Sequence, residues 1–188
     1  MFDLKIVGGT IVDGTGAPAF QGDVALDGDR IVQVGGKAGP GKRVVKAEGR
    51  LVTPGWVDVH THYDGQATWD SEMAPSSWHG VTTVLMGNCG VTFAPVRPDD
   101  RVFLAEMMES VEDIPRDAIL GGLPWDWVTY GEYLASIGRM PKGVNVGGMV
   151  GHCALRQYAM GERSMGKEVP TAAVPKAEGV AEDAWPTT

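Results

Sequence analysis

The stretch "TPGWVDVHTHYDGQ", residues 53–66, decides how the rest of the chain is interpreted. An apolar run ends there in two histidines, His60 and His62, that are separated by a single residue. Because side chains alternate along a β-strand, the two imidazoles are predicted on one face of a short strand. Val57 and Val59 take the other face, which is predicted to pack beneath helices.

Two imidazoles on one strand face can converge on a single cation. A lone histidine at this place would more simply be a polar residue bonded to the backbone. The pairing, followed at once by Tyr63 and Asp64, favours a metal site. Zinc accepts imidazole nitrogen and thiolate sulfur, and a catalytic zinc normally has three protein ligands. A further ligand must therefore come from elsewhere in the chain.

Downstream of this stretch, short apolar runs alternate with helical patterns. Strands are predicted at residues 56–62, 80–90 and 143–152, with helices starting near Asp99 and at Thr129, where Glu132 completes a capping box. An apolar stripe on the first of these helices is predicted to face the core: Phe103, Leu104, Met107, Met108 and Val111. This alternation is typical of parallel βα units.

Each of the three predicted strands ends in residues that can bind a metal. His60 and His62 end the first, Cys89 lies at the end of the second, and His152 ends the third. In α/β proteins, ligand-binding and catalytic groups gather at the carboxyl ends of the strands. The sequence therefore predicts one functional edge, built from segments that are distant along the chain.

Residues 1–55 have a different rhythm, with short β-branched runs separated by glycine turns. The first two, "DLKIV" (3–7) and "TIVDG" (10–14), are predicted as separate strands on either side of Gly8 and Gly9. "DG" at Asp27 lies between two such runs and predicts a hairpin. The predicted fold class is α/β, with a small β-sandwich-like or barrel-like module at residues 1–55 and about three βα units at 56–166. Residues 167–188, rich in Ala, Pro and Glu, are expected to form a flexible tail.

The composition of the 188 residues excludes several classes of function. A formal net charge of −8 disfavours nucleic acids and anionic membrane surfaces as partners. No apolar run approaches the roughly 20 residues that a transmembrane helix needs, and the N-terminus shows no secretory signal. With two cysteines, no disulfide framework is available, which favours a reducing, cytoplasmic location.

Three segments resemble a known family. "VTPGWVDVHTHYDG" (52–65) resembles the first barrel strand of the amidohydrolase superfamily, whose metal-dependent hydrolases have a (β/α)8 barrel preceded by a small β-rich module. "MGNCGVTFAPV" (86–96) resembles the N-acyl-D-amino-acid deacylases, or D-aminoacylases, as does "GHCALRQYAMGERSMG" (151–166). The resemblance implies a TIM-type barrel of which this chain holds only the first part.

The same resemblance implies zinc-dependent hydrolysis of the amide bond of N-acyl-D-amino acids. It assigns His60 and His62 as the paired ligands of one metal position, and Cys89 as the thiolate ligand of the tighter zinc position. Tyr63 and Asp64 are expected near the substrate.

The other histidines and the second cysteine are less clearly placed. His152 is expected either in the substrate pocket or in loop packing. Cys153 matches no ligand position of the family and is expected to be structural, as is His79, which precedes a strand at the opposite end of the barrel.

The family's remaining zinc histidines and its general-base aspartate are expected on later strands, so no catalytic residue is assigned within this chain. A TIM barrel typically needs about 250 residues. Two alternatives remain open. One is a hydantoinase- or dihydroorotase-like cyclic amidohydrolase, with a carboxylated lysine in place of Cys89. The other is a truncated, non-catalytic fragment or metal-binding remnant, which self-associates or is complemented through exposed sheet edges.

Overall fold

The computed structural model describes residues 1–167, so the predicted tail lies, from residue 168 on, outside the described residues. The chain divides into two compact units, Met1–Gly55 and Trp56–Thr188, and each is described by itself. Among the described residues, no helix has the length and apolar character needed to cross a membrane.

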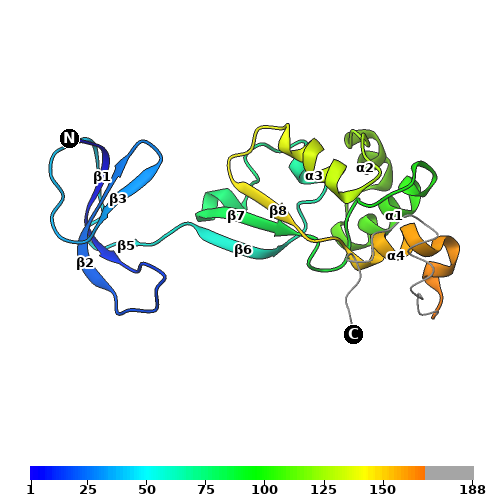
Figure 1. The fold of residues 1–188 in the computed structure, drawn as a ribbon, viewed down its shortest axis with the longest axis horizontal. Helices are drawn as coiled ribbons and strands as arrows, with labels where there is room; N and C mark the ends of the chain where they lie inside the picture. The colour runs from blue at the N-terminus through cyan, green and yellow to red at the C-terminus, as the bar shows by residue number, and fades with distance from the viewer. Residues whose placement is uncertain (168–188) are drawn as a thin grey trace. The chain divides into compact units, whose positions relative to one another are not determined.

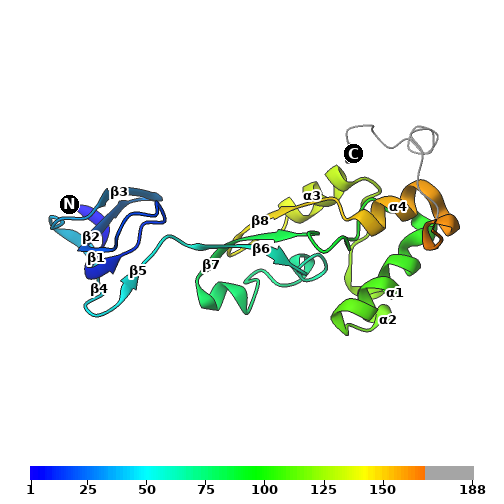
Figure 2. The same ribbon diagram turned by 90° about the horizontal axis from the view of Figure 1, so that it is seen from below.

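The first unit is one mixed five-stranded sheet (Figures 1 and 2). Its order is β3-β2-β1-β4, and β5 pairs with β1 beside β4. Strands β1, β2 and β3 are antiparallel, whereas β4 and β5 run parallel to β1. The strands are β1 (Phe2–Ile11), β2 (Phe20–Asp27), β3 (Arg30–Val34), β4 (Gly41–Lys46) and β5 (Leu51–Val52).

Strand β1 joins two runs that the sequence pattern keeps apart. Its register with β2 shifts between Ile6 and Gly9, where a bulge forms. Gly8 has φ +72° there, a conformation that glycine adopts without strain. A Cβ on Gly9 would lie 2.4 Å from Cγ2 of Val52, so a side chain there would collide with β5. The two glycines therefore bend one long strand instead of separating two short ones.

The hairpin predicted at "DG" is confirmed. Asp27 of β2 pairs with Arg30 of β3 in an antiparallel ladder, which leaves a two-residue turn. Gly28, the first turn residue, has φ +58°. A glycine is favoured there because side-chain-bearing residues rarely adopt positive φ.

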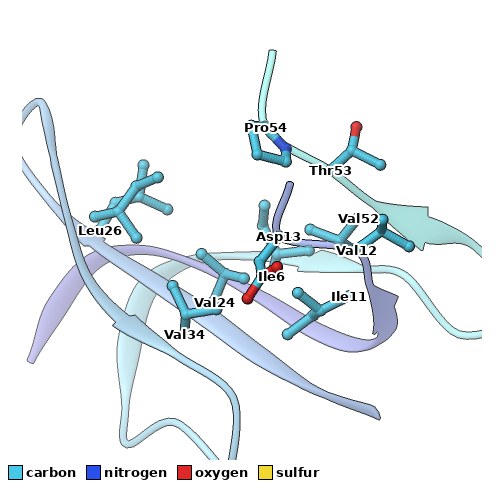
Figure 3. Close-up of a pocket in the computed structure, with 11 residues that line it drawn as sticks. Ile6, Ile11, Val12, Asp13, Val24, Leu26, Val34, Val52, Thr53 and Pro54 are labelled. Carbon is cyan, nitrogen blue, oxygen red and sulfur yellow. The ribbon is translucent and has the colours of Figure 1, made fainter. Parts of the chain in front are cut away.

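The apolar face of the first unit borders a hollow of about 220 Å³ (Figure 3). Ile6 and Ile11 of β1, Val24 of β2 and Val52 of β5 point into it from the sheet. The prediction of a sandwich-like module differs from the structure, because all five strands hydrogen-bond into a single sheet. Strand pattern alone predicts an apolar face, but it does not specify what covers that face.

The described part of the second unit has a parallel three-stranded sheet, ordered β6-β7-β8, and four α-helices. Both Figures 1 and 2 show α1, α2 and α4 beyond the carboxyl ends of the strands. The strands are β6 (Trp56–Thr61), β7 (Val81–Met86) and β8 (Asn145–Gly148). The α-helices are α1 (Arg101–Glu112), α2 (Arg116–Gly122), α3 (Tyr130–Gly138) and α4 (His152–Met160).

Most of the predicted elements are confirmed in this unit. The three strands and helices α1 and α3 form where the pattern places them, and α3 begins with the predicted capping box of Thr129 and Glu132. Helices α2 and α4 were not predicted. The crossover from β6 to β7 contains two 3-10 turns, η1 (Gln66–Thr68) and η2 (Ser76–His79), in place of the α-helix of a regular βα unit.

The core of the second unit lies against one face of β7, whose Val84 and Met86 are fully buried. Helix α1 contributes Leu104 and Met108, which are also buried, but Val111 of the predicted stripe is exposed. The buried face of α1 therefore runs through Leu104 and Met108 and leaves out Val111, the last member of the predicted stripe.

The prediction that the apolar face of β6 packs beneath helices is wrong. Val57 and Val59 are 58% and 56% exposed. The physical reason is the place of β6 in the sheet. It is an edge strand, with β7 as its one neighbour among the described strands, so it lies at the border of the packed core. The exposure of both valines shows that the face they share is largely open within the described part of the chain.

Candidate metal centre

The carboxyl ends of β6 and β7 are level with one another. Thr61, the last residue of β6, pairs with Met86, the last residue of β7. The Thr61 hydroxyl also donates a hydrogen bond to the Leu85 carbonyl at 2.9 Å. This register brings the histidines that end β6 beside the turn that follows β7.

That turn, Gly87–Gly90, presents Cys89 at its tip. The Gly90 N–H donates to the Gly87 carbonyl at 2.9 Å and closes the turn. The Asn88 side-chain amide donates to the Val59 carbonyl at 3.0 Å, so the turn is tied to β6. Cys89 is exposed. Its thiol therefore sits on a fixed backbone and is open to solvent.

Helix α4 holds the turn from a third side. The Cys153 N–H, in the first turn of α4, donates to the Gly90 carbonyl at 2.8 Å. Gly87 has φ +82°, and a Cβ there would lie 2.1 Å from the Met149 carbonyl oxygen. Only glycine fits at this position, because the chain leading into α4 passes directly against the turn.

The structure brings together the three predicted metal ligands. One ligand atom from each of His60, His62 and Cys89 lies within 4.8 Å of the other two. The two imidazole centroids are 5.5 Å apart, and the rings are tilted by 43°. Ligands of a tetrahedral zinc are separated by roughly 3.5 Å, so about 1 Å of side-chain movement suffices. Two imidazoles and one thiol are also the donors that zinc prefers.

An acidic residue that the sequence analysis missed contacts this group. Oε1 of Glu112, the last residue of α1, lies at ion-pair distance from Nδ1 of His62. Both side chains are partly buried. A signal was present in the sequence, because a carboxylate in the last turn of a helix opposes the helix dipole. A carboxylate in this position is therefore better explained by a contact outside its own helix.

Tyr63 and Asp64, expected near the substrate, lie in the core. The Tyr63 hydroxyl donates to Ser76 at 2.7 Å, and Asp64 is 0% exposed. The difference arises because β6 ends at Thr61 and the chain turns inward, as the Ala67 N–H to Tyr63 carbonyl bond shows. A substrate-pocket role for this pair remains a prediction that its burial does not favour.

Asp64 is a buried carboxyl group with neither oxygen hydrogen-bonded among the described residues. Burial raises its pKa from 3.8 to about 7, and the negative charge of Glu112 adds to the rise. The neutral form is therefore the one that the fold accommodates. The Tyr133 hydroxyl donates to the Asp64 backbone carbonyl at 2.8 Å, not to its carboxyl group.

This raised pKa predicts a stability that falls as pH rises. Between about pH 4 and pH 7 the folded chain holds a proton on Asp64 that the unfolded chain has lost, so stability decreases across this range. Above pH 7 the buried group ionises and the full penalty applies. We expect Asp64→Asn to remove most of this slope, measured by urea unfolding of the chelator-treated chain at several pH values. Asp117→Asn, an exposed control, should keep it; an unchanged slope in Asp64→Asn would contradict the assignment.

The structure also places the remaining histidines and Cys153. His152 is exposed in the first turn of α4, with its Cβ 3.7 Å from the position that a Cβ on Gly90 would take. It thus borders the Cys89 turn. Cys153 is half-buried, and burial and the neighbouring Cys89 both raise its pKa. His79 ends η2 before β7 starts, at the opposite end of that strand from the turn.

Comparison with known proteins agrees with this geometry. The sequence profile of the amidohydrolase family matches residues 43–185. N-acyl-D-aspartate deacylase of Alcaligenes xylosoxydans xylosoxydans is 39% identical over 161 residues, which are 84% of this chain and 30% of that enzyme. The chain thus spans about a third of the length of the curated relatives that it matches.

Solved structures give the same result. A D-aminoacylase described by its binuclear metal centre superposes with a TM-score of 0.76 at 34% identity, covering 98% of this chain and 36% of that protein. N-acyl-D-glutamate deacylase of Bordetella bronchiseptica, complexed with zinc and a phosphonate inhibitor, superposes with a TM-score of 0.73 at 33% identity. That match covers 94% of this chain and 34% of the deacylase.

Proposed function

Because the chain belongs to the amidohydrolase family, we propose that it carries the metal-binding part of an N-acyl-D-amino-acid deacylase. Such an enzyme hydrolyses the amide bond of N-acyl-D-amino acids. The observation that carries the proposal is the convergence of His60, His62 and Cys89 at one edge of the parallel sheet. Three of the relatives that match most of this chain are named as N-acyl-D-amino-acid deacylases or D-aminoacylase, which supports the choice of substrate class.

We propose zinc as the ion that these three residues hold. When bound, zinc supplies a Lewis acid that polarises an amide carbonyl and acidifies water. The chain's own contribution is to fix the ligands: the tied turn holds Cys89, and the level strand ends hold the two histidines beside it. Because His60 and Cys89 are exposed, an amide substrate can approach the site from solvent.

Cys89 supports this proposal over the cyclic amidohydrolase alternative, which needs a carboxylated lysine at the site. Lys142 precedes β8, at the end of the strand opposite to the Cys89 turn. Its ammonium group donates to the carbonyl oxygens of Ile137 and Met140. The thiol therefore occupies the place next to the histidines, while this lysine is bound elsewhere.

An assay with zinc present separates the candidate functions. In a protein that adds the rest of the barrel to this chain, we expect release of the free amino acid from N-acetyl-D-aspartate or N-acetyl-D-glutamate, none from the L-enantiomers, and loss of activity in His60→Ala. Opening of a hydantoin ring instead would favour the cyclic amidohydrolase. Zinc binding without turnover of either substrate class by that longer protein would favour a metal-binding remnant. Turnover by the 188-residue chain alone would refute the remnant hypothesis.

A further inference from the structure

The ion pair between Glu112 and His62 has a consequence for the metal site. Nδ1 of His62 is the ring nitrogen that lies at ion-pair distance from Oε1 of Glu112. That buried oxygen has no hydrogen-bond partner among the described residues, so a hydrogen on Nδ1 is the one available to it. The other ring nitrogen, Nε2, then keeps its lone pair. A neutral imidazole has one donor and one acceptor nitrogen, and the partner of the first fixes the role of the second.

The position of Glu112 is unfavourable for the helix that carries it. It is the last residue of α1, whose last turn contains no basic residue. Asp113, which follows, adds a second negative charge and has φ +55°. Negative charge at a helix C-terminus typically costs about 0.3–1 kcal/mol. Helix stability therefore gives no reason for a carboxylate here.

Neighbouring acidic residues have partners that Glu112 does not share. Arg116 pairs with Glu106 and Asp117, and its backbone N–H donates to Glu109. Within the described part of the chain, His62 is the ionisable group at ion-pair distance from Glu112. The contact with the metal-binding histidine is thus the interaction that accounts for Glu112.

The surroundings strengthen the contact. His62 and Glu112 line a small cavity of about 30 Å³, together with the apolar side chains of Trp69, Phe93 and Met108. An ion pair or charged hydrogen bond is stronger in such a medium than in water, because screening is weaker. Glu112 approaches the imidazole at Nδ1. The Nε2 edge of the ring is therefore directed away from the carboxylate.

We propose that Glu112 is a positioning residue: it fixes His62 as the Nδ1–H tautomer, so that Nε2 is the nitrogen available to the metal. The inference rests on the proposed function, which assigns His62 as a ligand. Histidines bound to metals commonly donate their second N–H to a carboxylate, and loss of that partner typically weakens metal binding 10–100-fold. Glu112 acts through His62 and does not itself touch the ion or the substrate.

The first experiment measures zinc affinity of the 188-residue chain by competition with a chromophoric chelator. We expect Glu112→Ala to bind zinc about 10–100-fold more weakly than the unmodified chain. Glu106→Ala removes the same charge from α1 without contact to His62 and should bind zinc normally. Glu112→Gln, which keeps the side-chain volume and one acceptor oxygen, should lie between the two and serves if Glu112→Ala does not fold.

The second experiment reads the tautomer of His62 without metal, by 15N NMR at a pH of about 8, above the ordinary histidine pKa of about 6.5. We expect Nδ1–H in the unmodified chain and a shift toward Nε2–H in Glu112→Ala. An unchanged tautomer in a folded variant would overturn the proposal. If the unmodified chain binds no zinc but the tautomer shifts, the metal assignment fails while the positioning of His62 by Glu112 stands.

Discussion

Cys89→Ala is expected to lower the zinc affinity of this chain by more than about 100-fold, because loss of a direct ligand should exceed the 10–100-fold typical for outer contacts. Cys89 supplies the one thiolate among the three converging ligand atoms, and thiolate is a strong zinc donor. The turn that carries it is tied to β6 and α4 by hydrogen bonds from the Asn88 side chain and the Cys153 backbone. The substitution therefore removes the ligand without loosening its support.

The measurement is zinc content after dialysis against a weak chelator, followed by a competition titration. The matched control is Cys153→Ala, because Cys153 borders the same turn but offers its backbone N–H, which alanine keeps. That variant should bind zinc as the unmodified chain does. Equal retention of zinc by Cys89→Ala would contradict a shared site and would leave His60 and His62 as a position of their own. A stoichiometry near two would show two neighbouring ions.

Much of the site could be predicted from sequence because it depends on strand periodicity. Two histidines one residue apart at the end of a strand must share a face, and parallel strands must end at a common edge. Those two rules place His60, His62 and Cys89 together without any knowledge of helices. They give no information on Glu112, which reaches His62 from the end of α1 through a tertiary contact.

The errors in the predicted fold have physical causes as well. Periodicity predicts which side chains share a face, but not whether another layer covers that face, so Val57 and Val59 were expected to be buried and are exposed. Helix α2 is seven residues long and contains two glycines, which weakens its helical pattern. Gly8 and Gly9 suggested a break between strands, whereas they form a bulge within one.

Trp127→Ala is expected to destabilise the second unit by about 3–5 kcal/mol, the range typical for truncating a buried tryptophan. Trp127 is 2% exposed, and its ring packs edge-on against Tyr133 with centroids 5.0 Å apart. Its indole N–H also donates to the Phe93 carbonyl at 2.8 Å. The variant therefore creates a cavity and leaves a buried carbonyl without its donor. Net stabilities of about 5–15 kcal/mol are usual, so this loss is large.

Urea unfolding followed by far-UV circular dichroism on metal-free chain measures the effect without relying on tryptophan fluorescence. Trp78→Ala is the matched control: Trp78 is 73% exposed, and surface substitutions usually change stability by less than about 0.5 kcal/mol. Trp127→Phe keeps most of the ring and loses the hydrogen bond, so it should cost about 1–3 kcal/mol and remain measurable if Trp127→Ala does not fold. Because Phe93 lies on the segment that leads from the Cys89 turn to α1, Trp127→Phe should also weaken zinc binding slightly. Equal stability of Trp127→Ala and Trp78→Ala would contradict the core described for this unit.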